Sequence, residues 1–463
     1  MIVVPAKAGT HPSTVFPADR RVADFRPGMI LDESICDLET MTASAVAEQT
    51  PLHLASVETR ASWVVALTAL GIYGVSFGAP IITVVALKPI AAELGGARSI
   101  PALAYSLAWL GSAVGGIAMG RVAERVGVRW TVMFGALMIG AGLAVSTIGG
   151  PTALYLGHGL LIGLLGNAGI NAPLYVYVAR WFDRHRGTAV GLISSGQSVA
   201  GMIWPVAFER GIATLGWRHT MLIYAVFEIA VILPAAILVF GPAPDSRGGA
   251  TASGPARGRL VLGLRPRTVQ IVLCTAGFLC CVPMAMPQGH LVAFCSDLGI
   301  PAVRGAGMLS LLLGCAFLGR QFWGAVADRI GGLRTILLGS VCQIAALTGF
   351  LLTEDEASLF AVAAIFGLGF SGIIPAYVVA VRDLFPAAEA SWRIPTVLLF
   401  SGSGMAAGGW LAGVIYDYAG FYAAAFATGI GVNLVHIVVI STLALRRNRV
   451  GAPGFGVPGP SGD

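Results

Sequence analysis

Arg320 is the residue of this sequence whose surroundings most clearly call for a chemical role. It lies near the middle of a long apolar run, four positions before Gly324. If that run crosses a membrane, a guanidinium there costs about 2.5 to 3.5 kcal/mol unless it faces a partner or a wet cavity. Because a guanidinium can hold a carboxylate through two parallel hydrogen bonds, Arg320 is a candidate anion clamp. Alternatively, it snorkels to the aqueous edge or pairs with Asp328.

Glu228, His290 and His158 are further polar residues inside apolar runs. The charged form of a buried carboxyl group is unfavourable, so Glu228 is a candidate for taking up and releasing a proton. His290 and His158 could bind an anion or relay protons. Each of the three could equally be a structural residue that is hydrogen-bonded to a neighbouring helix.

The elements that must position these residues are apolar segments of membrane-spanning length. The 463 residues are 56% hydrophobic and 11% charged, whereas soluble domains have about 25% charged residues. Twelve apolar runs are long enough to cross a hydrocarbon core of roughly 30 Å as helices, so we predict an all-α protein of the lipid bilayer. The predicted spans are 62–87, 100–120, 130–149, 152–178, 188–212, 219–241, 268–293, 304–326, 335–353, 358–381, 394–416 and 420–444.

One long polar segment divides the spans into two sets of six, and it is predicted to be a linker. The first 60 residues lack the basic and apolar regions of a signal peptide and are predicted to be disordered. Translation could instead start at Met29 or Met41. The predicted domains are a tail 1–61, a first bundle 62–241, a linker 242–267, a second bundle 268–444 and a tail 445–463.

The arginines predict the orientation. They cluster in loops on one side of the predicted membrane, which the positive-inside rule assigns to the cytoplasm together with both termini. The net charge of +6 therefore reflects topology, and nucleic-acid binding is not expected. The loop and tail arginines are Arg121, Arg125, Arg129, Arg180, Arg184, Arg186, Arg247, Arg257, Arg259, Arg265, Arg267, Arg329, Arg334, Arg446, Arg447 and Arg449.

The sequence carries no sign of a cofactor. Its seven cysteines show no CxxC or Cys/His ligand spacing. It also lacks a phosphate-binding loop, a nucleophile elbow and a dinucleotide fingerprint. No metal, cofactor or enzymatic activity is therefore expected.

A segment that begins at Gly120 recurs at Gly324, and each copy stands between two apolar runs. The glycines are expected to let neighbouring helices approach closely. Glu124 and Asp328 stand at helix ends, where a carboxylate can meet the positive end of a facing helix dipole and hold that side shut. The candidate gating residues are Gly120, Glu124, Arg125, Arg129, Gly324, Asp328, Arg329 and Arg334.

In duplicate, this segment resembles the signature loop of the major facilitator superfamily. The resemblance implies two pseudo-symmetric six-helix bundles that alternate access to a site near the midplane. Within the superfamily, several stretches resemble the oxalate/formate antiporter and monocarboxylate porter group. These stretches are Leu87 to Gly95, Arg180 to Gly191, Gly289 to Ala293, and Gly319-Arg320.

The resemblance implies that Arg320 binds the substrate. Oxalate porters also place a lysine in the eleventh helix, but the polar residues of that span here are Thr396, Ser401 and Ser403. A single fixed cation favours a monoanion, or an acid carried with a proton, over oxalate. The spans that line the cavity in this superfamily carry further candidate binding residues, namely His290, Tyr175, Tyr377, Asn171 and Gln288, and pocket residues Tyr105, Trp109, Asn167 and Trp204.

We therefore expect a monomeric secondary transporter in a bacterial-type inner membrane. Its expected substrate is a small organic anion, a mono- or dicarboxylate, moved by proton coupling or exchange with Glu228 as the coupling candidate. One alternative is an efflux antiporter for apolar, drug-like compounds, which would not need Arg320. Another is a membrane sensor that binds a ligand without transporting it.

Overall fold

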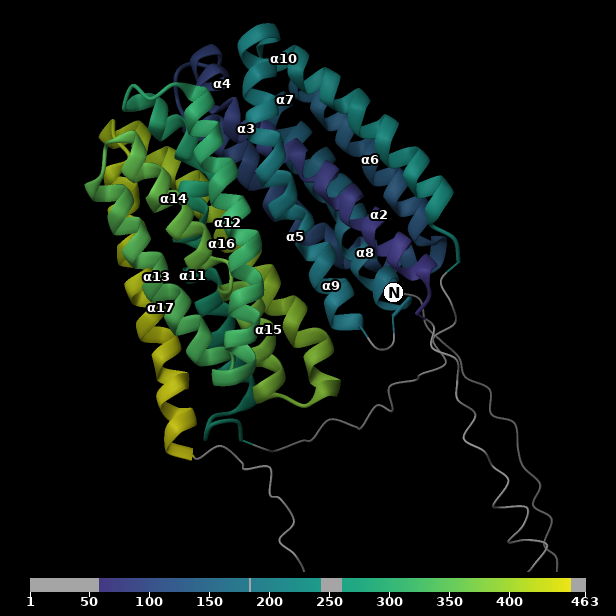
Figure 1. The fold of residues 1–463 in the computed structure, drawn as a ribbon, viewed down its shortest axis with the longest axis vertical. Coiled ribbons are helices and arrows are strands. Elements are labelled where there is room, and N and C mark those ends of the chain that lie inside the picture. Colours follow the sequence, from purple (N-terminus) through teal and green to yellow (C-terminus); the bar gives the residue numbers. More distant parts are fainter. Residues whose placement is uncertain (1–57, 183–184, 243–259, 451–463) are drawn as a thin grey trace, which may run out of the picture. The chain divides into compact units, whose positions relative to one another are not determined.

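The computed structural model describes residues 58–182, 185–242 and 260–450 (Figure 1). All of them belong to one compact unit, Ser56–Asp463. Most of the predicted tail 1–61, with Met29 and Met41, lies outside the described residues, as do most of the predicted linker 242–267 and the end of the tail 445–463. The start of that last tail is helical, because the final helix continues to Val450.

The first half of the described chain is entirely helical, apart from its turns. Its fourth span contains a π-helical stretch, η2, between two α-helical pieces. The elements are α2 (Arg60–Ser76), α3 (Gly78–Val85), α4 (Leu87–Glu93), α5 (Ser99–Val126), α6 (Val128–Ser146), α7 (Pro151–Tyr155), η2 (Leu156–Asn167), α8 (Ala168–Ala179), α9 (Arg186–Ser194) and α10 (Gly196–Val239).

The second half repeats this pattern. In it, as in the first half, no described residue belongs to a β-strand; a single bridge joins Val261 and Leu264. The elements are α11 (Pro266–Asp297), α12 (Ala302–Ile330), α13 (Gly332–Leu352), α14 (Glu356–Phe370), α15 (Ile373–Leu384), α16 (Ala387–Ala419) and α17 (Ala423–Val450).

Helix length and one glycine give the number of spans. Eleven helical segments of the described chain are long and apolar enough to cross a membrane. One of them, Thr188–Val239, has 52 residues and would extend for about 78 Å, more than twice the hydrocarbon thickness. Gly216 breaks this segment with φ 79° and ψ 162°, so it forms two spans. The twelve predicted spans are thus confirmed.

Glycine contacts bring helices together inside each half. A Cβ on Gly115 of α5 would lie 2.3 Å from the carbonyl oxygen of Leu164, and one on Gly408 of α16 would lie 2.1 Å from that of Val282. Backbones therefore touch at these positions, as small residues allow in membrane proteins. At Gly120 and Gly324 an added Cβ would meet no atom within 4 Å. The close helix approach expected at these two glycines is not seen.

The buried apolar residues form one cluster in each half. Across the halves, α5 packs against α16 and α10 packs against α12. The cluster of the second half also includes three described residues of the first half, Val84, Leu87 and Tyr105. Two bundles, each with its own apolar core and joined along these two helix pairs, are therefore observed (Figure 1).

Candidate functional site

Arg320 lies in α12 at the contact between the two halves. Its Nη1 donates a hydrogen bond of 2.8 Å to the carbonyl oxygen of Ser194, the last residue of α9. The Nε atom is buried without a hydrogen-bond partner among the described residues, and no described residue accepts from Nη2. The Nε and Nη2 edge is therefore free, and this edge can hold a carboxylate through two hydrogen bonds.

The alternative partner considered for Arg320 is not observed. Asp328 is exposed and forms no ion pair within the described chain. Instead, the segment that Arg320 contacts at Ser194 passes next to Tyr73, because a Cβ on Gly196 would lie 2.7 Å from Tyr73 Cδ1. The rings of Tyr73 and Tyr175 are neighbours, with centroids 6.0 Å apart. One guanidinium and two phenols from opposite halves thus form the centre of the candidate anion site.

Asn171 lies in a small cavity next to this centre. Tyr73 also lines the cavity, and because it packs next to Gly196, it connects Asn171 with the surroundings of Arg320. The full lining is Tyr73, Phe77, Pro80, Ala108, Trp109, Ser112, Asn167 and Asn171. The structure therefore brings together the predicted residues Arg320, Tyr175 and Asn171. Sequence reasoning missed Tyr73, although a tyrosine inside an apolar run is the same signal that singled out Tyr175.

Two other predicted binding residues point elsewhere. Gln288 Nε2 donates a 3.1 Å hydrogen bond to the carbonyl oxygen of Met284, within its own helix. Tyr377 is fully buried, and its hydroxyl lies 2.9 Å from His436 Nε2. No described contact joins either residue to Arg320, so the structure does not gather them at the anion site.

Glu228 stands apart from the Arg320 cluster. Its side chain is fully buried in α10, and neither carboxyl oxygen has a hydrogen-bond partner among the described residues. The hydroxyl of Tyr224, one turn earlier, donates to the carbonyl oxygen of Val75 at 2.5 Å. Glu228 is thus an isolated carboxyl group, and its proposed proton-coupling role stays a prediction.

The duplicated segments lie open at the end of the bundles that carries the arginine-rich loops, here called the arginine-rich end. Glu124 and Asp328 are exposed and make no ion pair in the described part of the chain. The predicted contact with a facing helix end is therefore absent in this conformation. Among the predicted gating arginines, Arg129 Nε donates to the carbonyl oxygen of Phe240 at 2.5 Å, and the others are exposed, namely Arg125, Arg329 and Arg334.

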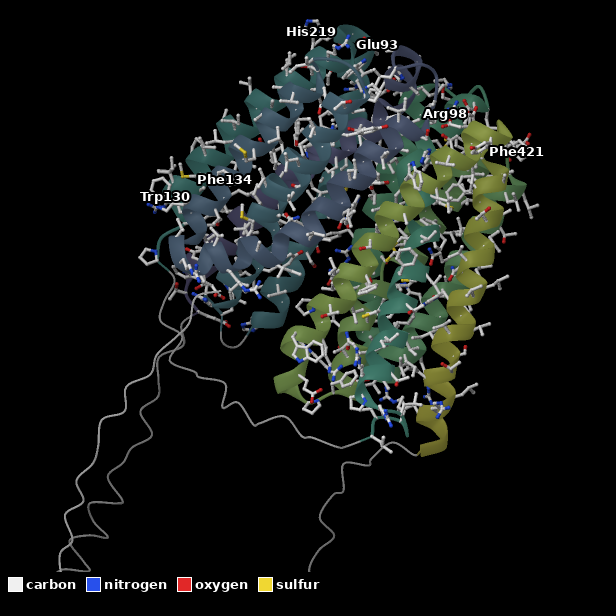
Figure 2. The ribbon with its side chains drawn as sticks, turned by 180° about the vertical axis from the view of Figure 1, so that it is seen from behind. Glu93, Arg98, Trp130, Phe134, His219 and Phe421 are labelled. Carbon is white, nitrogen blue, oxygen red and sulfur yellow. The ribbon has the colours of Figure 1, made fainter. Side chains whose placement is uncertain are left out.

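At the opposite end, here called the far end, charged residues join the two halves. Arg98 of the first half donates to both carboxylate oxygens of Asp297 in the second half, at 2.5 and 2.6 Å. Lys88 lies 3.1 Å from the same carboxylate. Figure 2 shows Arg98 and Phe421 at this end. We call the cluster of Lys88, Arg98 and Asp297, together with Asp417, Tyr422 and His290 described next, the latch.

A helix dipole completes the latch. The Asp417 carboxylate accepts hydrogen bonds from the backbone N–H groups of Arg98 and Ser99, at 2.8 and 2.9 Å. These groups form the start of α5, where a carboxylate is electrostatically favoured. The sequence predicted this kind of contact for Glu124 and Asp328 at the other end, and the structure instead shows it at the far end.

His290 belongs to the latch. Its Nδ1 lies 3.0 Å from the Tyr422 hydroxyl, which also accepts from Arg98 at 3.0 Å, and its Nε2 lies 2.8 Å from the Gly409 carbonyl oxygen. Because a carbonyl only accepts, Nε2 carries a hydrogen, and in the neutral imidazole Nδ1 then accepts from Tyr422. Both ring nitrogens are therefore engaged inside the protein, away from Arg320. His158 is similarly occupied by Thr83, Ser146 and Leu154.

Two duplicated helix bundles, with a buried charged site between them and a closed far end, define a polytopic membrane transporter. A family model described as the Major Facilitator Superfamily matches residues 62–356. This chain belongs to that superfamily, as the duplicated segment predicts.

Similar proteins agree with this assignment. A transporter of Gibberella moniliformis named for the superfamily is 25% identical over 308 residues, which cover 65% of this chain and 72% of the relative. Monocarboxylate transporter 13 of Rattus norvegicus is 24% identical over 359 residues, covering 73% and 81%. Among solved structures, an inward-facing, occupied bacterial homologue of the human lysosomal transporter Spinster matches with a TM-score of 0.63 and 15% identity, covering 84% and 96%.

Proposed function

We propose that this protein is a secondary active transporter of a small organic anion, a mono- or dicarboxylate. One observation carries the proposal: Arg320 is held between the halves with no carboxylate partner within the described chain. A charge at this depth is unfavourable unless something neutralises it. A substrate carboxylate would supply the missing partner, and the relative named as a monocarboxylate transporter supports the same class.

Two other arginines of the helices, Arg98 and Arg393, are buried and already neutralised. Arg98 pairs with Asp297 in the latch. Arg393 of α16 pairs with Glu389 at 2.7 Å, reaches Gln270, and lies 4.0 Å from the ring centroid of Phe385. Neither is available as a second anion ligand. A site with one free cation suits a monoanion, or an acid that enters together with a proton.

Alternating access accounts for the two ends of the molecule. The latch holds the far end shut, while the gating carboxylates of the arginine-rich end have no ion pair among the described residues. With the arginine-rich end in the cytoplasm, as the positive-inside rule favours, this conformation is closed to the outside. We further propose that the protein works as a monomer in a bacterial-type inner membrane, with both termini inside. Transport is driven by a proton on Glu228 or by exchange.

The test is uptake of labelled small carboxylates into proteoliposomes containing the purified protein. Arg320→Lys should weaken carboxylate binding at least about tenfold, or roughly 1.4 kcal/mol, because an ammonium cannot form the paired hydrogen bonds. Arg320→Ala should abolish uptake. Arg304→Lys is the matched control, since Arg304 is an exposed arginine of the same helix.

Thermal stability must be matched among the variants, because loss of a buried charge can unfold a bundle. A folded Arg320→Ala protein that takes up the acid with near-normal affinity would contradict the anion site and favour efflux of apolar compounds. Binding without counterflow would instead favour a sensor.

A further inference from the structure

A groove opens between α11 and α16 at the arginine-rich end of the second half. It has a volume of about 480 Å³, within the range of about 300 to 1,000 Å³ that is usual for ligand pockets. All its lining residues belong to these two helices and lie near their starts. Deeper in the bundle the two backbones touch, because a Cβ on Gly404 would lie 2.3 Å from the carbonyl oxygen of Phe278.

The lining of the groove changes from charged to apolar with depth. Arg267, the second residue of α11, stands at its mouth. Phe400 lies eight positions beyond Trp392 in α16, so the groove extends for about 12 Å at a rise of 1.5 Å per residue. Ile271 and Phe400 are 57% and 44% exposed. A charged mouth and an apolar interior match a molecule that has a charged head and a hydrocarbon tail.

The mouth of the groove has an excess of positive charge. Arg393 is buried and pairs with Glu389, and its guanidinium carbon lies 4.4 Å from the ring centroid of Trp392. Arg267 is exposed and has no ion pair among the described residues. Its guanidinium can therefore donate paired hydrogen bonds to a phosphate. The indole of Trp392 is of the kind that settles at the headgroup level of a bilayer.

The α16 wall of the groove faces away from the first half. The face of α16 that meets α5 carries Gly402, where an added Cβ would lie 3.1 Å from Ala113 Cβ. With 3.6 residues per turn, Thr396 and Phe400 lie about 120° and 160° round the helix from Gly402. These two residues therefore point to the side on which a membrane-spanning bundle meets the acyl chains of the bilayer.

We propose that this groove binds one anionic phospholipid from the leaflet that surrounds the arginine-rich end. Arg267 holds the phosphate, Trp392 lies beside the headgroup, and an acyl chain runs along Ile271, Thr275 and Phe400. A zwitterionic lipid fits less well, because its ammonium would stand next to an unpaired guanidinium, whereas anionic lipids are attracted to basic segments. The site is independent of Arg320 and of the substrate that the protein transports.

The experiment measures lipid binding to the purified full-length protein by native mass spectrometry in detergent. Phosphatidylglycerol and phosphatidylcholine with the same acyl chains are compared. One phosphatidylglycerol molecule should bind at least about tenfold more tightly than phosphatidylcholine, and Arg267→Gln should remove this preference. Arg446→Gln is the matched control, since Arg446 is an exposed arginine of α17 that does not line the groove. It should leave the preference unchanged.

A second pair of variants tests the groove itself. Thr275→Phe fills the groove from an exposed position and keeps both arginines, so it should weaken binding of phosphatidylglycerol at least about tenfold. Thr442→Phe makes the same exchange at an exposed threonine of α17 and should leave binding within about twofold. If Thr275→Phe lowers the melting temperature, Thr396→Phe fills the groove from α16 instead.

Three results would overturn the proposal. The first is equal affinity for the two lipids. The second is binding that depends on Arg267 but survives the filling of the groove, which would show attraction to a basic surface only. The third is competition by free glycerol 3-phosphate at the concentrations at which the lipid binds, which would assign the groove to a soluble anion. Carboxylate uptake through Arg320 is measured separately, so it can fail or succeed without changing these results.

Discussion

At the scale of single residues, the charged groups inside the bundles are of two kinds. Some have an oppositely charged partner, and others have none among the described residues. Arg98 and Arg393 each have a carboxylate partner, whereas the described chain offers none to Arg320. Glu228 is the opposite case, a buried carboxyl group without a donor. Unpaired charges in membrane spans are expensive, and they mark sites of ion or proton movement. These two residues are therefore where substitution should affect transport most.

Glu228→Gln tests proton coupling. A permanently neutral amide mimics only the protonated state of the carboxyl group. If Glu228 carries the coupling proton, the variant should lose pH-driven accumulation of substrate yet retain exchange of internal for external substrate. Both activities are measured in proteoliposomes with and without an imposed pH gradient.

Glu209→Gln is the matched control, since Glu209 is a second buried glutamate of α10. It should leave both activities unchanged. Accumulation that persists in Glu228→Gln at the wild-type level would assign Glu228 to structure.

At the scale of the elements, backbone contacts through glycine hold each bundle together. α5 packs against η2 and α8, and Gly115 is where the backbones touch. Gly216 acts differently, because its positive φ ends one span and starts the next within one long helical segment. Gly127 and Gly331, with φ of 95° and 82°, end α5 and α12 in the duplicated segment. The second glycine of each copy is thus required by the turn.

Two alanine substitutions in α5 should distinguish a glycine that is needed for helix packing from the first glycine of the duplicated segment. Gly115→Ala places a Cβ against the Leu164 carbonyl and should destabilise the protein by about 1 to 3 kcal/mol, the usual range for overpacking. Gly120→Ala meets no neighbour and should leave the melting temperature unchanged or slightly raised. The measurement is thermal unfolding of the purified variants in detergent. Equal melting temperatures for the two would refute the packing role of Gly115.

At the scale of the whole described chain, the two ends are unequal. The far end is held by charge pairs, a helix-dipole contact and the hydrogen bonds that run from Arg98 through Tyr422 to His290. The arginine-rich end shows no matching contact from Glu124 or Asp328 in the described residues. A transporter that alternates between two conformations must break one set of contacts when it forms the other. We therefore expect Glu124 and Asp328 to engage facing helices when the latch opens.

Arg98→Gln should shift the population towards a conformation open at the far end. Ser106 is a suitable reporter, because it is buried and a Cβ on Gly409 of the opposite half would lie 3.1 Å from its Oγ. In a Ser106→Cys background, a membrane-impermeant thiol reagent added from the far side should react at least about tenfold faster when Arg98→Gln is present. The same protein without Ser106→Cys gives the background from the native cysteines.

Arg304→Gln is the matched control for the latch. Arg304 pairs with Glu356 at the same end, but both residues belong to the second half. Its removal should not alter the labelling rate. Identical rates for the Arg98→Gln and Arg304→Gln proteins would show that the latch does not hold the halves together.

The amino-acid sequence by itself determines the spans, the duplication and the depth of the charged residues. Hydropathy depends on local composition, so apolar runs of sufficient length predict membrane helices wherever they occur. The repeated segment at Gly120 and Gly324 predicted two related halves, and Arg320, well inside the eighth span, predicted a charge at membrane depth. These properties are readable because each follows from residues that are close together in the chain.

Only the tertiary structure decides which side chains meet. From the sequence, His290, Tyr377 and Gln288 had the same predicted role as Tyr175. Helix packing instead places His290 in the latch and Tyr377 next to His436, and Gln288 bonds to its own helix. It also predicted contacts for Glu124 and Asp328 that this conformation lacks, and gave no sign of the Arg98 to Asp297 pair. The physical reason is that rotation and tilt of a helix are fixed by packing against distant segments. In a protein with two conformations, contacts between the halves also depend on which conformation is populated.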